Sequence, residues 1–108
     1  MIRSIIIDDE QHCIKALLSD LQKHCSSIEV VEACSSAKEG MRAIKKLNPD
    51  LVFLDVEMPW MNGFEMLDLL GEINFSIIFT TAHDEFAAKA FRISAVDYLL
   101  KPIDANDL

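Results

Sequence analysis

Four short apolar segments of the chain are followed, directly or closely, by polar side chains that could take part in chemistry. The segments are Arg3–Ile7, Leu51–Leu54, Ile77–Phe79 and Tyr98–Leu100, and the side chains that follow them belong to Asp8, Asp9, Asp55, Thr81 and Lys101. If the segments are neighbouring parallel strands, these carboxylates, hydroxyl and ammonium meet at one edge of a sheet. Such a set suits a site that handles a phosphoryl group together with a divalent cation.

The composition is that of one acidic domain. The chain has 108 residues, of which 51% are hydrophobic, so it can bury a core and is not expected to be disordered. The net charge of −8 disfavours nonspecific nucleic-acid binding by this chain. An acidic surface would suit a basic partner, although most acidic domains are simply soluble.

The cysteines and the apolar runs both favour a cytoplasmic protein. Cys13, Cys25 and Cys34 are odd in number and form no CxxC pair, which indicates reduced thiols rather than disulfides or a metal or redox site. The first apolar run, Ser4–Ile7, is too short for a secretion signal. No apolar stretch approaches the roughly 20 residues that span a bilayer, so we expect no membrane contact.

Segments of strand character alternate with helical patterns along the whole chain. The expected strands are Arg3–Ile7, Ile28–Cys34, Leu51–Leu54, Ile77–Thr81 and Val96–Leu100. The expected helices are Glu10–His24, the segment between Ser36 and Asn48, Phe64–Leu70, Glu85–Ile93, and a truncated last helix from Asp104. Ser36 and Glu39 are expected to form a capping box at the start of the second helix, and Asn48-Pro49 ends it. Gly71 closes the third helix. This alternation predicts an α/β domain whose parallel sheet is covered by helices on both faces.

The carboxylates of Asp8, Asp9 and Asp55 are the candidate ligands of a divalent ion. When carboxylates crowd around one cavity, each raises the cost of ionising its neighbours, and a bound cation removes that cost. Mg²⁺ prefers a few carboxylates together with waters and a substrate phosphate. Asp8 and Asp9 could instead cap the following helix, whose positive dipole end favours acids. Asp55 and Lys101 make the metal site the better interpretation.

Asp55 is the candidate nucleophile, because a carboxylate can attack phosphorus to form an acyl phosphate. Lys101 would place an ammonium beside the phosphoryl oxygens, and Thr81 would donate its hydroxyl to one of them. Taken alone, Thr81 would be an ordinary strand residue and Lys101 a solvated loop lysine. Their positions after successive strands favour the phosphoryl site.

Four stretches of sequence match the motifs of a known family: Ile5–Glu10, Leu54–Pro59 with Gly63, Thr81-Ala82 and Tyr98–Pro102. In this order and spacing they resemble the receiver domain of bacterial two-component response regulators, and they span nearly the whole chain. The resemblance implies a flavodoxin-like (CheY-like) doubly wound sheet of five parallel strands in the order 2-1-3-4-5. It implies one receiver domain over residues 1–108, with the last helix incomplete and the effector domain absent.

The resemblance assigns roles to the matched positions. It implies that Asp55 accepts a phosphoryl group from a histidine kinase and that Lys101 pairs with this group. Mg²⁺ would be bound directly by Asp9 and Asp55, through water by Asp8, and by the backbone carbonyl of Glu57. The chain would catalyse only its own phosphoryl transfer and autodephosphorylation, and would therefore be a signalling domain rather than an enzyme.

The resemblance also implies a conformational switch. The hydroxyl of Thr81 would move toward the phosphoryl group, and the ring of Tyr98 would turn inward to fill the space. Tyr98 could equally be an ordinary strand aromatic. Glu57 and His83 occupy positions that tune the lifetime of the phosphoryl group in this family.

Partners follow from the same resemblance. The kinase would dock over the helix that begins at Glu10. A symmetric dimer would use a face that contains Lys89, Arg92 and Asp97, although single surface charges are weak support for an interface. Phe79–Ala87 and Ala95–Tyr98 resemble the subgroup whose effector is a LytTR-type (LytR/AlgR) DNA-binding domain, which implies transcription regulation.

Two other functions stay open on the sequence. A haloacid-dehalogenase-type phosphatase also uses an aspartate nucleophile, Mg²⁺ and a lysine, but its nucleophile ends the first strand in an Asp-x-Asp motif. Here Asp55 follows the third strand and precedes Val56-Glu57. A receiver that never takes phosphate and works as a protein-binding module is the other alternative, although no part of the expected site is missing.

Overall fold

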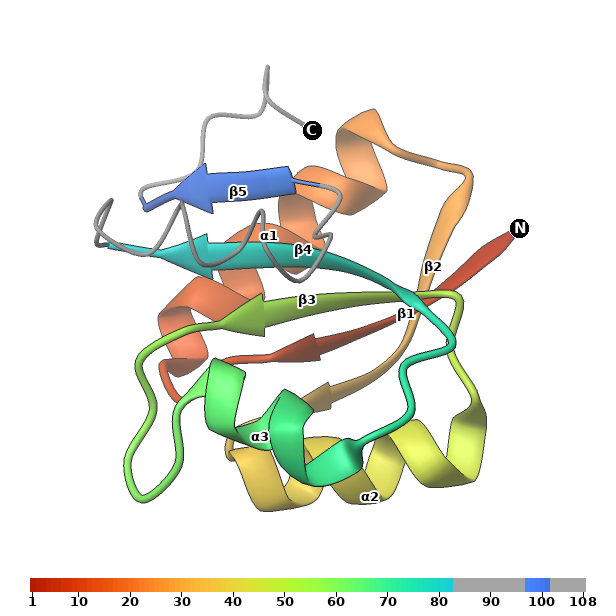
Figure 1. The fold of residues 1–108 in the computed structure, drawn as a ribbon. Coiled ribbons are helices and arrows are strands. Elements are labelled where there is room, and N and C mark those ends of the chain that lie inside the picture. The colour runs from red at the N-terminus through yellow and green to blue at the C-terminus, as the bar shows by residue number, and fades with distance from the viewer. Residues whose placement is uncertain (83–96, 102–108) are drawn as a thin grey trace.

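The computed structural model describes residues 1–82 and 97–101, which form a parallel sheet flanked by helices (Figure 1). The elements are β1 (Ile2–Ile7), α1 (Gln11–His24), β2 (Ile28–Cys34), α2 (Ala37–Leu47), β3 (Leu51–Asp55), α3 (Gly63–Leu70), β4 (Ser76–Thr81) and β5 (Asp97–Leu100). The strand order is β2-β1-β3-β4-β5, as expected for a doubly wound sheet. Every pairing is parallel.

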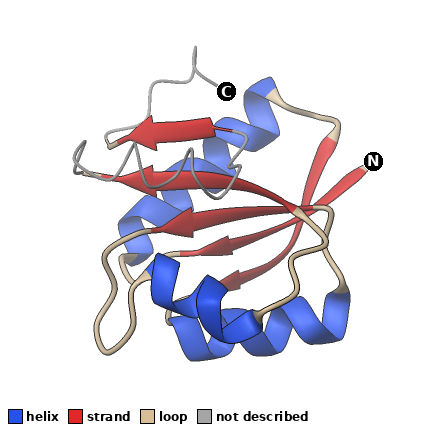
Figure 2. Ribbon diagram, in the orientation of Figure 1, coloured by secondary structure: helices blue, strands red, loops and turns tan. Residues whose placement is uncertain are grey.

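Alternate residues of the central strands face two hydrophobic clusters, one on each side of the sheet. Helix α1 covers one face, and α2 and α3 cover the other (Figure 2). Under α1, Ile6 and Phe53 meet Ile14, Leu17 and Leu21. The opposite cluster includes Ile5, Ile7, Val52, Leu54, Ile77, Phe79, Ile44, Phe64, Met66 and Leu67. Strand β3 is buried at every position, which agrees with the uninterrupted apolar run Leu51–Leu54 that precedes its last residue, Asp55.

The helix ends agree with the predicted caps except at one position. The Ser36 hydroxyl accepts a hydrogen bond from the backbone N–H of Glu39 at 3.2 Å, as predicted. The other half of that capping box is wrong, because the Glu39 carboxylate accepts from the N–H and hydroxyl of Ser35 instead. The complete capping box lies at α3, where Asn62 and Glu65 satisfy each other's backbone N–H groups.

Several predictions fall on residues outside the described part of the chain. These are the helix Glu85–Ile93, the last helix from Asp104, and the side chains of His83, Lys89 and Arg92. Asp97 and Tyr98 belong to β5 by their backbone, but their side chains also lie outside the description. Among the described helices, none combines the length and the apolar character needed to cross a membrane.

Candidate functional site

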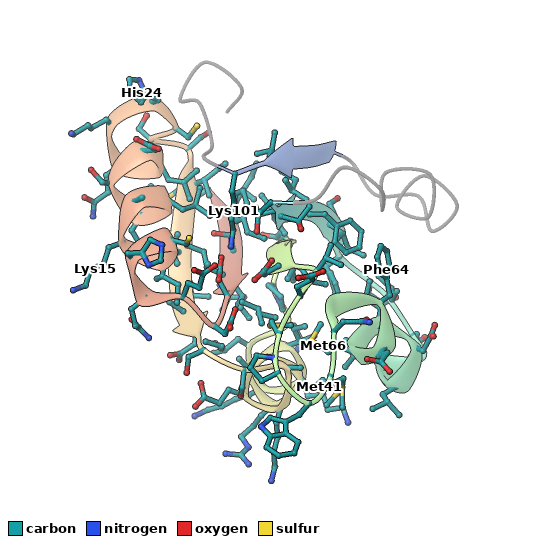
Figure 3. All side chains as sticks on the ribbon, turned by 90° about the vertical axis from the view of Figure 1, so that its left-hand side faces the viewer. Lys15, His24, Met41, Phe64, Met66 and Lys101 are labelled. Carbon is teal, nitrogen blue, oxygen red and sulfur yellow. The ribbon has the colours of Figure 1, made fainter. Side chains whose placement is uncertain are left out.

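The register of the sheet brings the carboxyl ends of its strands to one edge. Pairing near this edge joins Ile7 to Leu54, Asp55 to Thr80, and Thr81 to Leu100. Because the strands are parallel, Asp8, Asp55 and Lys101 lie at the same edge, which faces the viewer in Figure 3. A backbone hydrogen bond of 2.7 Å from the N–H of Lys101 to the carbonyl of Thr81 fixes the backbone of Lys101 beside the end of β4.

The ammonium of Lys101 is the positive centre of the site. Its Nζ lies 2.8 Å from Oδ2 of Asp8 and 3.5 Å from Oδ2 of Asp55. A third carboxylate oxygen, Oε1 of Glu10, lies 3.4 Å from the same nitrogen. Because the side chains of Lys101, Asp8 and Asp55 are nearly buried, solvent screens these two ion pairs weakly, whereas the half-exposed Glu10 makes a more screened pair.

Four carboxylates surround this edge of the sheet. Oxygens of Asp8, Asp9, Glu10 and Asp55 all lie within 4.8 Å of one another. Asp8 and Asp55 are buried, Asp9 is half-buried and Glu10 is exposed. Lys101 is the one ammonium that contacts them among the described residues, so three negative charges are unbalanced when all four acids are ionised. A hard divalent cation with oxygen ligands fits this donor set.

The charge imbalance appears in the acidity of Asp55. Burial, followed by the negative charge of Asp8, raises the pKa of Asp55 from 3.8 to about 7, against the opposing effect of Lys101. For Lys101, burial alone would lower the pKa, but the hydrogen bond to Asp8 and the charges of Asp55 and Asp8 raise it above its ordinary value. Lys101 is therefore always protonated, whereas Asp55 needs further positive charge to ionise fully near neutral pH.

Backbone hydrogen bonds hold Asp8 in place and close the loop that follows Asp55. The N–H of Asp8 donates to the carbonyl of Cys34 at 3.0 Å, and Oδ1 of Asp8 accepts from the N–H of Glu10 at 3.0 Å. The second bond turns the chain into α1. After Asp55 the chain forms a loop that closes where the N–H of Gly63 donates to the carbonyl of Val56 at 2.8 Å.

Gly63 is required by this close approach. A Cβ at this position would lie 2.7 Å from the carbonyl oxygen of Asp55, nearer than real Cβ contacts allow. The loop between them carries Trp60, which is fully exposed and has a positive φ of 72°. The glycine therefore sets how the loop folds back against the end of β3.

The remaining predicted residues are placed as follows. Thr81 is fully buried at the end of β4, and Glu57 is exposed in the loop two residues after Asp55. Glu10, which was expected as the start of a helix and the end of the motif Ile5–Glu10 but not as a site residue, contributes a carboxylate to the site. Its position directly after Asp8-Asp9 was the available signal.

Comparison with known proteins identifies the family. The family model described as "Response regulator receiver domain" matches residues 5–108. The chain belongs to this family. Receiver domains are signalling domains of two-component systems that work with histidine kinases and effector domains, and they generally bind Mg²⁺ at an acidic pocket.

Relatives of this receiver domain include named transcriptional regulators. It is 50% identical over 105 residues to the transcriptional regulatory protein BtsR of Escherichia coli K12, covering 96% of this chain and 44% of BtsR. It is 47% identical over 109 residues to an uncharacterized response regulatory protein of Yersinia pestis, covering 100% of this chain and 45% of that protein. The chain thus spans less than half the length of these relatives.

Solved structures of receiver domains have the same fold. The response regulatory domain of mrkE from Klebsiella pneumoniae superposes with a TM-score of 0.87 at 26% identity, covering 97% of this chain and 87% of that one. The REC domain of AraT from Geobacillus stearothermophilus gives 0.86 at 28% identity, covering 98% and 85%.

Proposed function

We propose that this receiver domain is a phosphorylation-dependent switch that accepts a phosphoryl group on Asp55 from a histidine kinase. One observation supports this most strongly: the buried carboxylate of Asp55 lies 3.5 Å from the Lys101 ammonium, within a cluster of three further carboxylates. A nucleophile, a fixed positive charge and a cation-binding set of oxygens are thus in one place.

The residues fit a resident Mg²⁺. In the proposed site Asp9 and Asp55 would hold it directly and Asp8 would hold it through water, with the backbone carbonyl of Glu57 as a further ligand. The support is the all-oxygen donor set and the unbalanced negative charge at the sheet edge. When bound, the ion lowers the pKa of Asp55 and screens its repulsion from phosphoryl oxygens.

The proposed reaction is an in-line phosphoryl transfer. A carboxylate oxygen of Asp55 forms a bond to phosphorus while the bond between phosphorus and the kinase histidine nitrogen breaks, and the electron pair returns to the imidazole. Lys101, already at the Asp55 carboxylate, neutralises charge on the transferred group. Because Lys101 is also held by Asp8, its position is set before the phosphoryl group arrives.

The proposed conformational change after phosphorylation involves residues at the end of β4 and on β5. The Thr81 hydroxyl moves to the phosphoryl group, and Tyr98 follows it on the neighbouring strand β5. The support is that Thr81 is the last residue of β4 and its carbonyl accepts from the N–H of Lys101. Glu57 and His83 set the lifetime of the acyl phosphate.

We place this switch in a longer cytoplasmic transcription regulator. Its support is that the chain matches under half of BtsR, which is named a transcriptional regulatory protein. In this proposal the effector is a LytTR-type DNA-binding domain. The kinase docks over α1, and a symmetric homodimer forms through the face with Lys89, Arg92 and Asp97.

Incubation with acetyl phosphate and Mg²⁺, followed by intact mass measurement, tests the proposal. Wild type should gain one phosphoryl group, and Asp55→Asn should gain none. Asp68→Asn, which changes an exposed acid on α3, should behave as wild type. No gain in wild type would favour the phosphate-independent binding module. Sustained hydrolysis of p-nitrophenyl phosphate would instead favour a phosphatase.

A further inference from the structure

A second ligand set, of different chemistry, lies at the start of α1. Glu10, His12 and Cys13 each offer one ligand atom, and these atoms all lie within 4.8 Å of one another. Nε2 of His12 is 3.6 Å from Oε2 of Glu10, and Sγ of Cys13 is 4.0 Å from Oε1 of Glu10. An oxygen, a nitrogen and a sulfur ligand therefore lie close together within the short segment 10–13.

Local structure explains this grouping. Glu10 is the N-cap residue of α1, and its side chain makes no capping hydrogen bond. Its carboxylate is consequently not committed to the helix. Cys13 lies three positions later, where the side chain of a helix faces the N-cap residue. The three residues also line a cavity of about 410 Å³ beside the sheet edge, so an ion there has room for water.

The spacing suits a tetrahedral metal ion. With metal–ligand bonds of about 2.0 to 2.3 Å, neighbouring ligands around tetrahedral zinc are about 3.3 to 3.8 Å apart. His12 Nε2 lies within this range of one Glu10 oxygen, at 3.6 Å, and Cys13 Sγ lies 4.0 Å from the other Glu10 oxygen, so a small side-chain adjustment would bring all three ligands onto one ion. The His12 side chain is 79% exposed, so it can turn to complete the geometry. Thiolate and imidazole ligands select zinc-class ions over Mg²⁺.

We propose that Glu10, His12 and Cys13 bind a divalent transition metal of the zinc class, with the fourth position open to water. This site is separate in chemistry from the all-oxygen cluster but shares Glu10 with it. Glu10 also lies 3.4 Å from the Lys101 ammonium. A metal ion bound to Glu10 would therefore compete with Lys101 for one of the three carboxylates that the ammonium contacts.

Cobalt absorption in the presence of excess Mg²⁺ tests this site directly, because a thiolate-to-cobalt band requires a sulfur ligand and the all-oxygen cluster has none. Wild type should bind one Co²⁺ with thiolate-to-cobalt charge-transfer absorption, and Zn²⁺ should displace it. Cys13→Ser should abolish the band, and His12→Ala should weaken binding by at least about tenfold. The control variants Cys25→Ser and His24→Ala should bind as wild type.

The proposal is overturned if wild type shows no band, if the band survives in Cys13→Ser, or if His12→Ala binds unchanged. Circular dichroism shows whether each variant is folded. An experiment on wild type alone removes any dependence on folding of variants: Zn²⁺ should slow alkylation of Cys13 by iodoacetamide and leave Cys25 unchanged. Equal alkylation of Cys13 with and without Zn²⁺ contradicts the site. Neither result depends on whether Asp55 accepts phosphate.

Discussion

The ammonium of Lys101 lies closer to Asp8 than to Asp55, with Nζ–Oδ2 distances of 2.8 and 3.5 Å. Because the side chains of Lys101 and Asp8 are 12% and 5% exposed, their ion pair is nearly buried. Burial and the negative charge of Asp8 raise the pKa of Asp55 to about 7, and the more distant Lys101 ammonium offsets this rise only in part. Ionisation of Asp55 in the metal-free site is therefore opposed by its surroundings.

Replacing Lys101 with Met should destabilise the fold by about 3 kcal/mol at neutral pH. The reason is that Asp8 and Asp55 would be left buried without a positive partner. Urea unfolding at pH 7 and pH 4 measures the effect, which should shrink at the lower pH because Asp55, whose pKa is raised to about 7, becomes protonated. Lys46→Met, on the exposed face of α2, should change stability by less than about 0.5 kcal/mol. Equal losses in both variants would contradict a special role for the Lys101 ion pairs.

Asp55 should make the metal-free protein less stable as the pH rises from 4 to 8. Its folded-state pKa of about 7 lies above the ordinary value of 3.8, so the folded state binds this proton more tightly than the unfolded chain. The stability that this proton provides is present below pH 3.8 and is lost as the pH rises toward 7. Asp55→Asn should consequently be more stable than wild type at pH 8 in EDTA, by on the order of 1–3 kcal/mol.

Urea unfolding across this pH range, with and without Mg²⁺, measures that difference. Mg²⁺ should stabilise wild type at pH 8 and have a smaller effect on Asp55→Asn. Asp68→Asn, on the exposed face of α3, should follow the wild-type curve. A wild-type protein whose stability rises from pH 5 to 8 in EDTA at the same rate as Asp55→Asn would show that Asp55 is not destabilising.

Gly63→Ala should impair phosphorylation more than its effect on stability accounts for. The added Cβ would lie 2.7 Å from the Asp55 carbonyl oxygen, a backbone atom that cannot move without shifting the end of β3. Gly40→Ala is the matched control, because its Cβ would meet the side chain of Ile7 at 2.5 Å in the core. Both should lose about 1–3 kcal/mol of stability. Rates of acetyl phosphate labelling should fall markedly in Gly63→Ala only; similar rates in the two variants would rule out positioning of Asp55 by this loop.

Trp60→Gly should stabilise the protein by up to about 1 kcal/mol. Trp60 has a φ of 72° and is fully exposed, so glycine removes backbone strain without loss of packing. Thermal unfolding measures the change. Asn48→Gly tests the same conformation at φ 46° and should gain less, because asparagine tolerates the left-handed region. Destabilisation by Trp60→Gly would mean that the indole makes contacts that its exposure hides.

The sequence was informative where local rules decide the structure. Alternating segments predicted the parallel sheet, and Asn48 and Gly71 end α2 and α3 as expected. The Glu39 interaction was missed because its carboxylate can reach either of two adjacent N–H groups, and only the turn before α2 selects Ser35.

For the site, too, the sequence predicted which residues meet but not every interaction between them. Strand ends predicted that Asp55 and Lys101 share an edge of the sheet, since parallel strands fix that geometry. The preference of Lys101 for Asp8 depends on side-chain packing between distant segments, which spacing does not encode. Glu10 was overlooked for the same reason, because its role follows from the turn that Asp8 makes into α1.

Chemical trapping of the phosphorylated residue tests the central claim most directly. After labelling with acetyl phosphate and Mg²⁺, borohydride reduction converts an aspartyl phosphate to homoserine, which peptide mass spectrometry locates in the sequence. We predict homoserine at position 55 and unmodified aspartate at positions 8 and 9. Homoserine at position 8 or 9, or at no position in a protein that is folded and bound to Mg²⁺, would contradict the assignment of Asp55 as the phosphoacceptor.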